Sequence, residues 1–200
     1  MPNCLYHTDG LILGSWPTGE SSRLFQIFTE RLGRVTALAA GVRELKSKLR
    51  YSLIESDLVK ISLVRGRGVW RIINVEPRFN LGDFNKIEPL ECGPAKRAAA
   101  ARLCRLLIRF VVDEGRRANV WREAESAYEF LMAETFSPEA LANFELLAML
   151  RLLETLGYCE TSPLLRPLGA PWQLTKVETF TSHRQTALAI VEQALYHSHL

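Results

Sequence analysis

The chain has 200 residues, a formal net charge of +3 and a hydrophobic content of 48%. This length permits one large domain or two small ones, and this composition excludes a wholly disordered chain. The sequence has no apolar run of about 18 residues, and its N-terminus lacks a basic segment followed by an apolar one. We therefore expect neither a membrane span nor a signal peptide, and we place the protein in the cytoplasm.

Positive charge is concentrated in the first part of the chain. Residues 1–80 hold twelve Lys and Arg and seven Asp and Glu, a net charge of +5, whereas residues 81–200 carry −2. Between residues 33 and 50, Glu44 is the one acid among five basic residues, which are Arg34, Arg43, Lys46, Lys48 and Arg50. Charge of one sign on one connection favours a phosphate backbone as partner, and a solvated face is the alternative.

The first 80 residues show strand patterns separated by turn formers. Apolar or alternating runs cover residues 11–16, 23–30, 34–41, 53–64 and 69–77, the last ended by Pro77. A hairpin turn is predicted at Arg65-Gly66-Arg67-Gly68. Five short strands predict a small barrel or a sandwich, and the barrel would be a five-stranded OB-fold or an SH3-like barrel. We expect Phe25 and Phe28 in its core and leave Trp70 open between core and base stacking.

The composition changes after residue 78, where residues 79–94 resemble a connector and the rest is helical. Helices are predicted over 96–113, from an Asn119 cap onward, over 138–157 and over 182–197, with a loop over 160–180. Ser137-Pro138-Glu139 is a strong helix start, and Gly157 a strong helix end. The last helix is expected to pack Leu188, Val191 and Leu195. The predicted fold class is α+β, with a β-barrel domain at 1–80 and an all-α domain at 81–200.

No catalytic motif is present, and we expect no enzyme activity and no cofactor. The four cysteines, Cys4, Cys92, Cys104 and Cys159, show no metal-ligand spacing, and Cys104 fits a helix core. The candidate phosphate contacts are the five basic residues between 33 and 50 together with Arg65 and Arg67 of the hairpin. Tyr51 and Trp70 are candidates for base stacking.

Three stretches resemble the bacterial RecO family of DNA repair and recombination proteins. They are GESSRLFQIFTERLGRVTALAAGVRELKSKLR at 19–50, SLIESDLVKISLVRGRGVWRIINVEP at 52–77 and NFELLAMLRLLETLGY at 143–158. The basic motif of the family is matched at Gly41, Arg43, Lys46 and Ser47. It departs at Val42, where alanine is usual, and at Glu44, where a further basic residue is common.

The resemblance implies an N-terminal OB-fold, a helical domain and a mediator without catalytic turnover. Members of the family bind single- and double-stranded DNA, anneal complementary strands and work with RecR to load RecA onto DNA coated by single-strand binding protein. They recognise the C-terminal tail of that protein through the helical domain. Here Arg102, Arg105, Arg109 or Arg151 could receive the carboxylate of the tail, although for any one of them a solvated surface residue is the favoured interpretation.

Two departures from the family pattern bear on this expectation. Many members carry a zinc-binding cysteine cluster after Leu-Gly-Tyr, where this chain has Cys159 alone, so we predict no zinc and no metal. The C-terminal part is shorter than usual, which fits either a compact member or a diverged relative that keeps only part of the activity. The alternatives are a protein-interaction adaptor, with an exposed apolar patch on the helix at 137–157, and a small enzyme with an unrecognised cleft.

Overall fold

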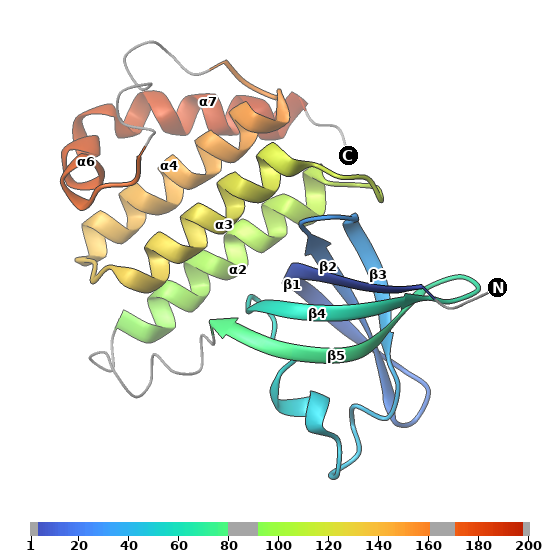
Figure 1. The fold of residues 1–200 in the computed structure, drawn as a ribbon. Coiled ribbons are helices and arrows are strands. Elements are labelled where there is room, and N and C mark those ends of the chain that lie inside the picture. Colours follow the sequence, from blue (N-terminus) through green and yellow to red (C-terminus); the bar gives the residue numbers. More distant parts are fainter. Residues whose placement is uncertain (1–3, 80–91, 161–170, 198–200) are drawn as a thin grey trace. The chain divides into compact units, whose positions relative to one another are not determined.

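A computed structural model of the chain describes residues 4–79, 92–160 and 171–197 (Figure 1). The chain forms two compact units, one of Met1–Ile87 with Val111–Ala118, the other of Glu88–Phe110 with Asn119–Leu200. Most of the predicted connector at 79–94 lies outside the described residues. Within the described ranges, no helix has the length and apolar character that a membrane crossing requires.

The first unit is a closed five-stranded barrel. Its strands are β1 (Leu5–Thr18), β2 (Ser22–Thr29), β3 (Gly33–Ala39), β4 (Leu58–Arg65) and β5 (Trp70–Phe79). They follow one another around the barrel as β1-β2-β3-β5-β4, and β4 returns to pair with β1 (Figure 1). The pairing of β3 with β5 is parallel and the other pairings are antiparallel. The barrel is an OB-fold, so of the two predicted barrels the SH3-like one is wrong.

Alternation along the strands fills the barrel with apolar side chains. Ile12, Ile27, Ala37, Val59 and Leu63 are fully buried in one cluster. Burial of each large apolar side chain contributes about 1.5–3 kcal/mol, and this burial fixes the register of the strands.

Three aromatic residues of the barrel, Phe25, Phe28 and Trp70, are also buried. Phe25 lies in the barrel core, as predicted. Phe28 is also buried, but it faces the opposite side of β2 from Phe25 and Ile27 and does not belong to that core cluster. Trp70, which the sequence left open, is 4% exposed and joins the same cluster as Phe25. Trp70 is therefore a core residue and does not offer a face for base stacking.

The fourth strand begins later than its sequence pattern predicts. Residues 53–57 do not pair as a strand, because Asp57 donates its backbone N–H to Ile54 O at 3.2 Å and Ser56 has a positive φ of 70°. This turn docks on the first strand instead, since Ile12 and the turn exchange backbone hydrogen bonds of 3.0 and 2.8 Å. The predicted strand start at residue 53 is wrong because these polar residues satisfy their backbone in a turn.

The fifth strand runs past the proline that was expected to end it. Pro77 lies opposite Val59, beside an irregularity in the register between Leu58 and Val59. Here β5 pairs only with β4, because its pairing with β3 is confined to Trp70 and Arg71. A proline is tolerated on such an edge, where no neighbouring strand needs its missing N–H.

The second unit is helical. Its elements are α2 (Cys92–Phe110), α3 (Ala118–Ala133), α4 (Pro138–Leu156), α6 (Leu174–Thr179), the 3-10 helix η3 (Phe180–His183) and α7 (Arg184–His197). The predicted ends of α4 are confirmed. Ser137 Oγ accepts the backbone N–H of Ala140 at 3.2 Å, and Gly157 ends the helix in the left-handed conformation at φ 82°.

Four helical predictions need correction. The helix predicted over 96–113 covers Cys92–Phe110, so it begins inside the predicted connector and ends earlier than expected. Asn119 lies inside the first turn of α3 and accepts a hydrogen bond from Arg122, so it is not the cap. Residues 174–179, expected as loop, form α6. Of the three residues predicted to pack in α7, Val191 is buried, Leu195 is half-buried and Leu188 is 46% exposed. Ala187 and Ala194 are buried with Val191, because these three share the face turned inward.

Buried contacts between helices hold the second unit together. Cys104 is buried as predicted, and its Sγ lies 3.0 Å from Tyr128 Oη, which joins α2 to α3. The Asn143 amide on α4 donates to Val177 O at 3.1 Å and to Thr181 Oγ1 at 2.9 Å. The apolar side chains of α4 are buried, among them Leu146, Leu147, Leu150, Leu152 and Leu153. The exposed patch that an adaptor would need on this helix is therefore not found.

Candidate nucleic-acid interface

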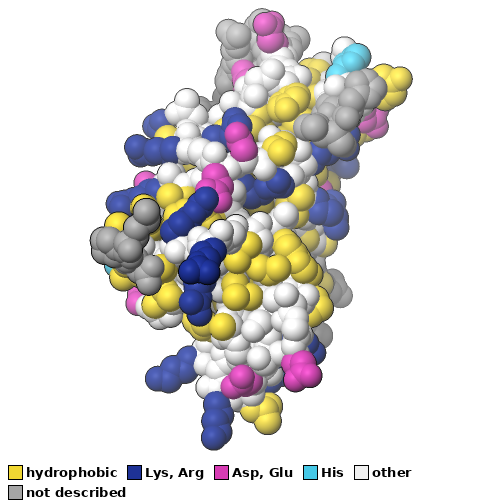
Figure 2. Space-filling model, turned by 90° about the vertical axis from the view of Figure 1, so that its right-hand side faces the viewer, with side chains coloured by type: hydrophobic (Ala, Val, Ile, Leu, Met, Phe, Trp, Pro, Cys, Tyr) yellow, Lys and Arg dark blue, Asp and Glu magenta, His cyan; other side chains and the backbone are white. Residues whose placement is uncertain are grey.

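The β3–β4 connection, residues 40–57, carries four of the seven basic residues selected from the sequence. Arg43, Lys46, Lys48 and Arg50 are all exposed, and the last two belong to the 3-10 helix η1 (Lys48–Tyr51). Figure 2 shows Lys and Arg side chains projecting at the lower end of the face it presents, the level of this connection in Figure 1. The connection therefore offers a cluster of solvated cations at one end of the barrel.

Short anchors hold this basic connection against the turn between β1 and β2. The Arg43 backbone N–H donates to Ser21 O at 2.9 Å, and that of Gly41 donates to Ser22 Oγ at 3.3 Å. Val42 and Leu53 are buried in the barrel core on either side of the basic residues. The loop is thus tied down at both ends, while its charged side chains stay in solvent.

A groove of about 640 Å³ lies between this connection and the strands β1 and β2. Its charged lining consists of Arg23, Arg43 and Arg50 against a single acid, Glu55. Arg23 donates to Ser15 Oγ at 2.7 Å, and Ser15 donates to Glu55 at 2.8 Å. The groove is therefore basic on balance and suits an anion.

Arg23 was not selected from the sequence as a contact. Its Nε is buried and has no hydrogen-bond partner among the described residues. The sequence contained a feature that could have identified it, because Arg23 is the arginine of the turn Gly19-Glu20-Ser21-Ser22-Arg23. Only the fold places that turn beside the basic connection.

The predicted hairpin turn between β4 and β5 is confirmed by a Gly66 N–H to Val69 O bond of 3.1 Å. Arg67 on this turn is exposed, whereas Arg65 pairs with Glu114, with Nη1 2.5 Å from Oε2. The Arg65 guanidinium also lies 4.8 Å from the centre of the Trp70 ring. A phosphate that reached Arg65 would have to compete with Glu114.

Arg34 lies at the start of β3 and is half-buried. Its guanidinium donates to Val112 O at 2.7 Å, and its backbone N–H donates to Asp113 O at 3.2 Å. Burial lowers the pKa of Arg34, while the Asp113 carboxylate acts in the opposite direction. Arg34 thus holds residues 111–118 on the barrel, and it does not join the exposed cations of the β3–β4 connection.

Gly33 permits the same contact between the barrel and residues 111–118. Its φ is 72°, and a Cβ at this position would lie 2.3 Å from Gly115 O. The Gly115 N–H donates to Leu32 O at 2.9 Å. Only glycine combines this backbone conformation with so close an approach.

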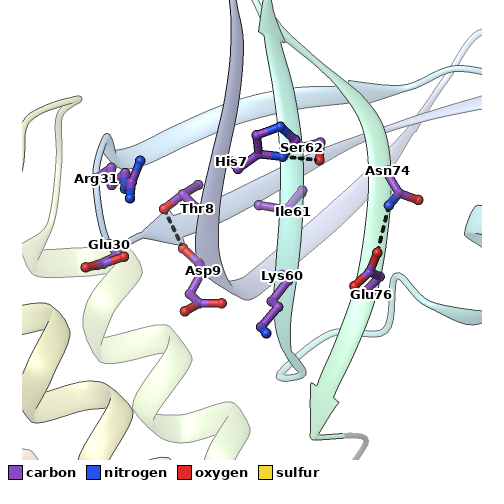
Figure 3. Close-up of a pocket in the computed structure, with 10 residues that line it drawn as sticks. All are labelled: His7, Thr8, Asp9, Glu30, Arg31, Lys60, Ile61, Ser62, Asn74 and Glu76. Atoms are coloured by element: carbon purple, nitrogen blue, oxygen red, sulfur yellow. Dashed lines mark hydrogen bonds between the residues drawn. The ribbon is translucent and has the colours of Figure 1, made fainter.

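A second hollow, of about 290 Å³, lies on the outer wall of the barrel across β1, β4 and β5 (Figure 3). Its charges are mixed, with Asp9, Glu30 and Glu76 beside Arg31 and Lys60. His7 Nδ1 lies 2.9 Å from Ser62 Oγ, and Asn74 donates to Glu76 at 3.2 Å (Figure 3). Because these charges compensate one another, the hollow does not favour a polyanion.

Most of the arginines suggested as receptors of a carboxylate already form ion pairs or hydrogen bonds within the helical unit. Arg102 forms a bidentate pair with Glu145, and this hydrogen bonding raises the pKa of Arg102. Arg151 pairs with Glu123, with Nε 2.7 Å from Oε1, and Arg109 donates to Leu195 O at 2.7 Å. Arg105 and Arg109 are the exposed members of the four, and Arg105 has neither an ion pair nor a hydrogen bond within the described ranges. It is the best placed of the four to meet a new anion.

The prediction of no zinc stays a prediction, since residues 161–170 lie outside the described part of the chain. Among the residues that are described, no group of three or more His, Cys, Asp or Glu side chains is arranged to hold a metal ion. Cys159 is half-buried. Its burial raises the pKa of the thiol, and the negative charge of Glu154 adds a smaller effect in the same direction. A protonated thiol is a poor metal ligand.

Comparison with known proteins agrees with the barrel and its basic connection. Residues 1–80 match the family model described as "Recombination protein O N terminal". A "DNA repair protein RecO" from Clostridium perfringens (strain 13 / Type A) is 30% identical over 158 residues, which cover 77% of this chain and 59% of that protein. Proteins of the same name from Heliobacterium modesticaldum and Myxococcus xanthus are 24% and 29% identical, over 98% and 72% of this chain.

The chain spans only part of these relatives, namely 67% of the Heliobacterium protein and 57% of the Myxococcus protein. The match to the family model nevertheless includes the barrel and its β3–β4 connection. On the family model and these relatives together, the chain belongs to the RecO family.

Proposed function

We propose that this protein is a DNA-binding recombination mediator in DNA repair, which acts in the cytoplasm without catalytic turnover. It binds single- and double-stranded DNA, anneals complementary strands and, with RecR, helps to load RecA onto DNA coated by single-strand binding protein. In this proposal residues 1–80 form the DNA-binding domain and residues 81–200 the helical domain. The observation that supports it best is the cluster of exposed cations beside the basic groove on an OB-fold barrel.

Electrostatics connect this surface to binding and annealing. Each Lys or Arg that contacts a phosphate releases condensed counterions, so affinity falls steeply as salt rises. The proposed contacts include Arg23, which lines the groove. The others are the seven basic residues selected from the sequence, namely Arg34, Arg43, Lys46, Lys48, Arg50, Arg65 and Arg67. Because contacts to phosphate carry no sequence information, such a surface suits a phosphate backbone of any sequence. Neutralised phosphates on two strands repel each other less, which favours annealing.

The helical unit is the proposed site for the tail of single-strand binding protein. An acidic, apolar tail that ends in a carboxylate needs an arginine beside an apolar surface. Arg105 is exposed on α2, whereas Arg102 and Arg151 already hold Glu145 and Glu123. We therefore assign Arg105 as the first arginine to test for this partner.

The proposal is tested by fluorescence anisotropy of a labelled single-stranded oligonucleotide, titrated with the whole chain at several salt concentrations. We expect binding at low salt that weakens along a straight line of log affinity against log salt. Absence of binding at low salt would overturn the proposal. A duplex of the same length and an annealing assay with complementary strands then test the second substrate and the activity.

A further inference from the structure

A row of side chains crosses four neighbouring strands on the outer wall of the barrel. Trp16 on β1 is paired with Leu24 on β2, Leu24 with Leu38 on β3, and Leu38 with Arg71 on β5. Residues directly opposite each other on adjacent strands share a face. We call Trp16, Leu24, Leu38 and Arg71 the outer-wall row.

Alternation places this row outside the barrel. Phe25 and Ala37, the next residues along β2 and β3, are buried in the core, so Leu24 and Leu38 face the opposite way. Trp16 is 40% exposed and Arg71 is exposed, while Leu24 and Leu38 are half-buried. The row therefore offers an indole ring, an apolar floor and a terminal cation. Figure 2 shows apolar side chains gathered above the lower, basic end of the face it presents.

The outer-wall row adjoins the basic groove. Ser15 lines the groove, and Trp16 follows it in the chain on the other face of β1. The turn that follows Trp16 holds the β3–β4 connection through the bond from the Arg43 N–H to Ser21 O. Cations thus lie in the groove on the other face of β1 and at Arg71 in the row itself. Such charge suits an occupant that is both planar and anionic.

We propose that the outer-wall row is a stacking surface for the unpaired bases of single-stranded DNA, with Trp16 as the ring on which a base stacks. This inference rests on the function proposed above and assigns the bases a place separate from the phosphates. An extended strand would keep its phosphates against Arg23, Arg43 and Arg50 in the groove. Its bases would turn onto the outer wall. Paired bases are shielded inside a duplex, so the row contributes only to single-strand binding.

The test compares two probes of equal length and charge, an oligothymidylate and an oligonucleotide whose sites are all abasic. The variant is Trp16→Leu, which keeps an apolar side chain for packing and removes the ring. We expect it to bind the oligothymidylate about tenfold more weakly and the abasic probe unchanged, since stacking acts on bases alone. The salt dependence should stay the same, because no phosphate contact is lost.

Two further variants make the result specific. Trp16→Phe keeps a ring and should restore most of the affinity, and it should abolish the quenching of tryptophan fluorescence that oligothymidylate causes. Tyr196→Ala removes a ring that is 74% exposed in the helical unit, and it should leave the affinity for both probes unchanged. A fold check by circular dichroism accompanies each variant.

The outcomes separate this inference from the proposed function. If the native chain binds neither probe, the proposed function fails. If it binds both probes equally and Trp16→Leu changes nothing, phosphate binding stands and the stacking surface is refuted. An equal loss of affinity for both probes in Trp16→Leu also refutes the stacking surface. So does a Trp16→Phe variant that binds the oligothymidylate as weakly as Trp16→Leu does.

Discussion

Arg65 and Glu114 form an ion pair between the β4–β5 turn and the connection that follows α2. The Arg65 Nη1 lies 2.5 Å from Glu114 Oε2, and the other carboxylate oxygen accepts the Trp70 indole N–H at 3.1 Å. Both partners of the ion pair are about half exposed, at 56% and 46%. One of the proposed phosphate contacts is therefore already occupied by an acid of the same unit.

Glu114→Gln is expected to strengthen DNA binding. The amide keeps an oxygen for Trp70 but no longer holds Arg65 by charge, so the guanidinium is free for a phosphate. The gain should be at most about fivefold, because an exposed ion pair is worth about 1 kcal/mol or less. The slope of log affinity against log salt should steepen by about 0.7 for a single strand. Anisotropy at several salt concentrations measures both quantities.

The control for Glu114→Gln is the double variant with Arg65→Gln. Without the guanidinium, the loss of Glu114 should add nothing beyond the removal of one diffuse negative charge. If Glu114→Gln strengthens binding equally with and without Arg65, the ion pair does not limit that arginine.

Reversing two charges of the β3–β4 connection is expected to weaken DNA binding. Lys46→Glu with Lys48→Glu removes two exposed cations and should reduce the salt slope for a single strand by about 1.4. The same anisotropy titration measures the change. Unchanged affinity at low salt would remove both lysines from the site.

Charge-matched reversals in the helical unit provide the comparison. Lys176→Glu with Arg184→Glu changes the net charge of the chain by the same amount, far along the sequence from the barrel. This control should leave the slope unaltered. An equal effect of the two pairs would indicate a response to net charge alone.

Gly33→Ala is expected to destabilise the barrel unit by more than about 2 kcal/mol. A left-handed backbone costs a non-glycine residue about 1–2 kcal/mol, and the new Cβ would meet Gly115 O. Gly19→Ala is the matched control, since Gly19 has a φ of 60° but no atom within 4 Å of the added Cβ. Urea unfolding should show the larger loss for Gly33→Ala, and equal losses would contradict the close approach.

Asn143→Ala is expected to loosen the contact of α4 with α6 and η3. The amide donates to Val177 O and Thr181 Oγ1 and is fully buried, so its removal leaves a buried carbonyl without its partner. The cost should be about 1–3 kcal/mol. Limited proteolysis should then cut within residues 171–183 faster than in the native chain. Asn74→Ala, on the exposed wall of the barrel, should leave that rate unchanged.

Local patterns predicted many of the secondary-structure elements. The barrel strands follow from alternation, because an apolar side chain on every second residue can be buried on only one face. The start and end of α4 follow from Ser137 and Gly157, because their chemistry acts on the adjacent backbone. The strand start at residue 53 and the Asn119 cap were wrong, since a turn against Ile12 and a helix start at Ala118 depend on tertiary contacts.

The candidate site shows the same division. The sequence by itself determined that the cations of the β3–β4 connection would be exposed, because a run with many charges and few apolar residues cannot be buried. Only the tertiary structure decided that Arg23 lines the same groove, that Trp16 lies outside the barrel while Trp70 is buried, and that Glu114 holds Arg65. Each of these depends on residues that are distant in the chain and are brought together by closure of the barrel, and no local pattern encodes that distance.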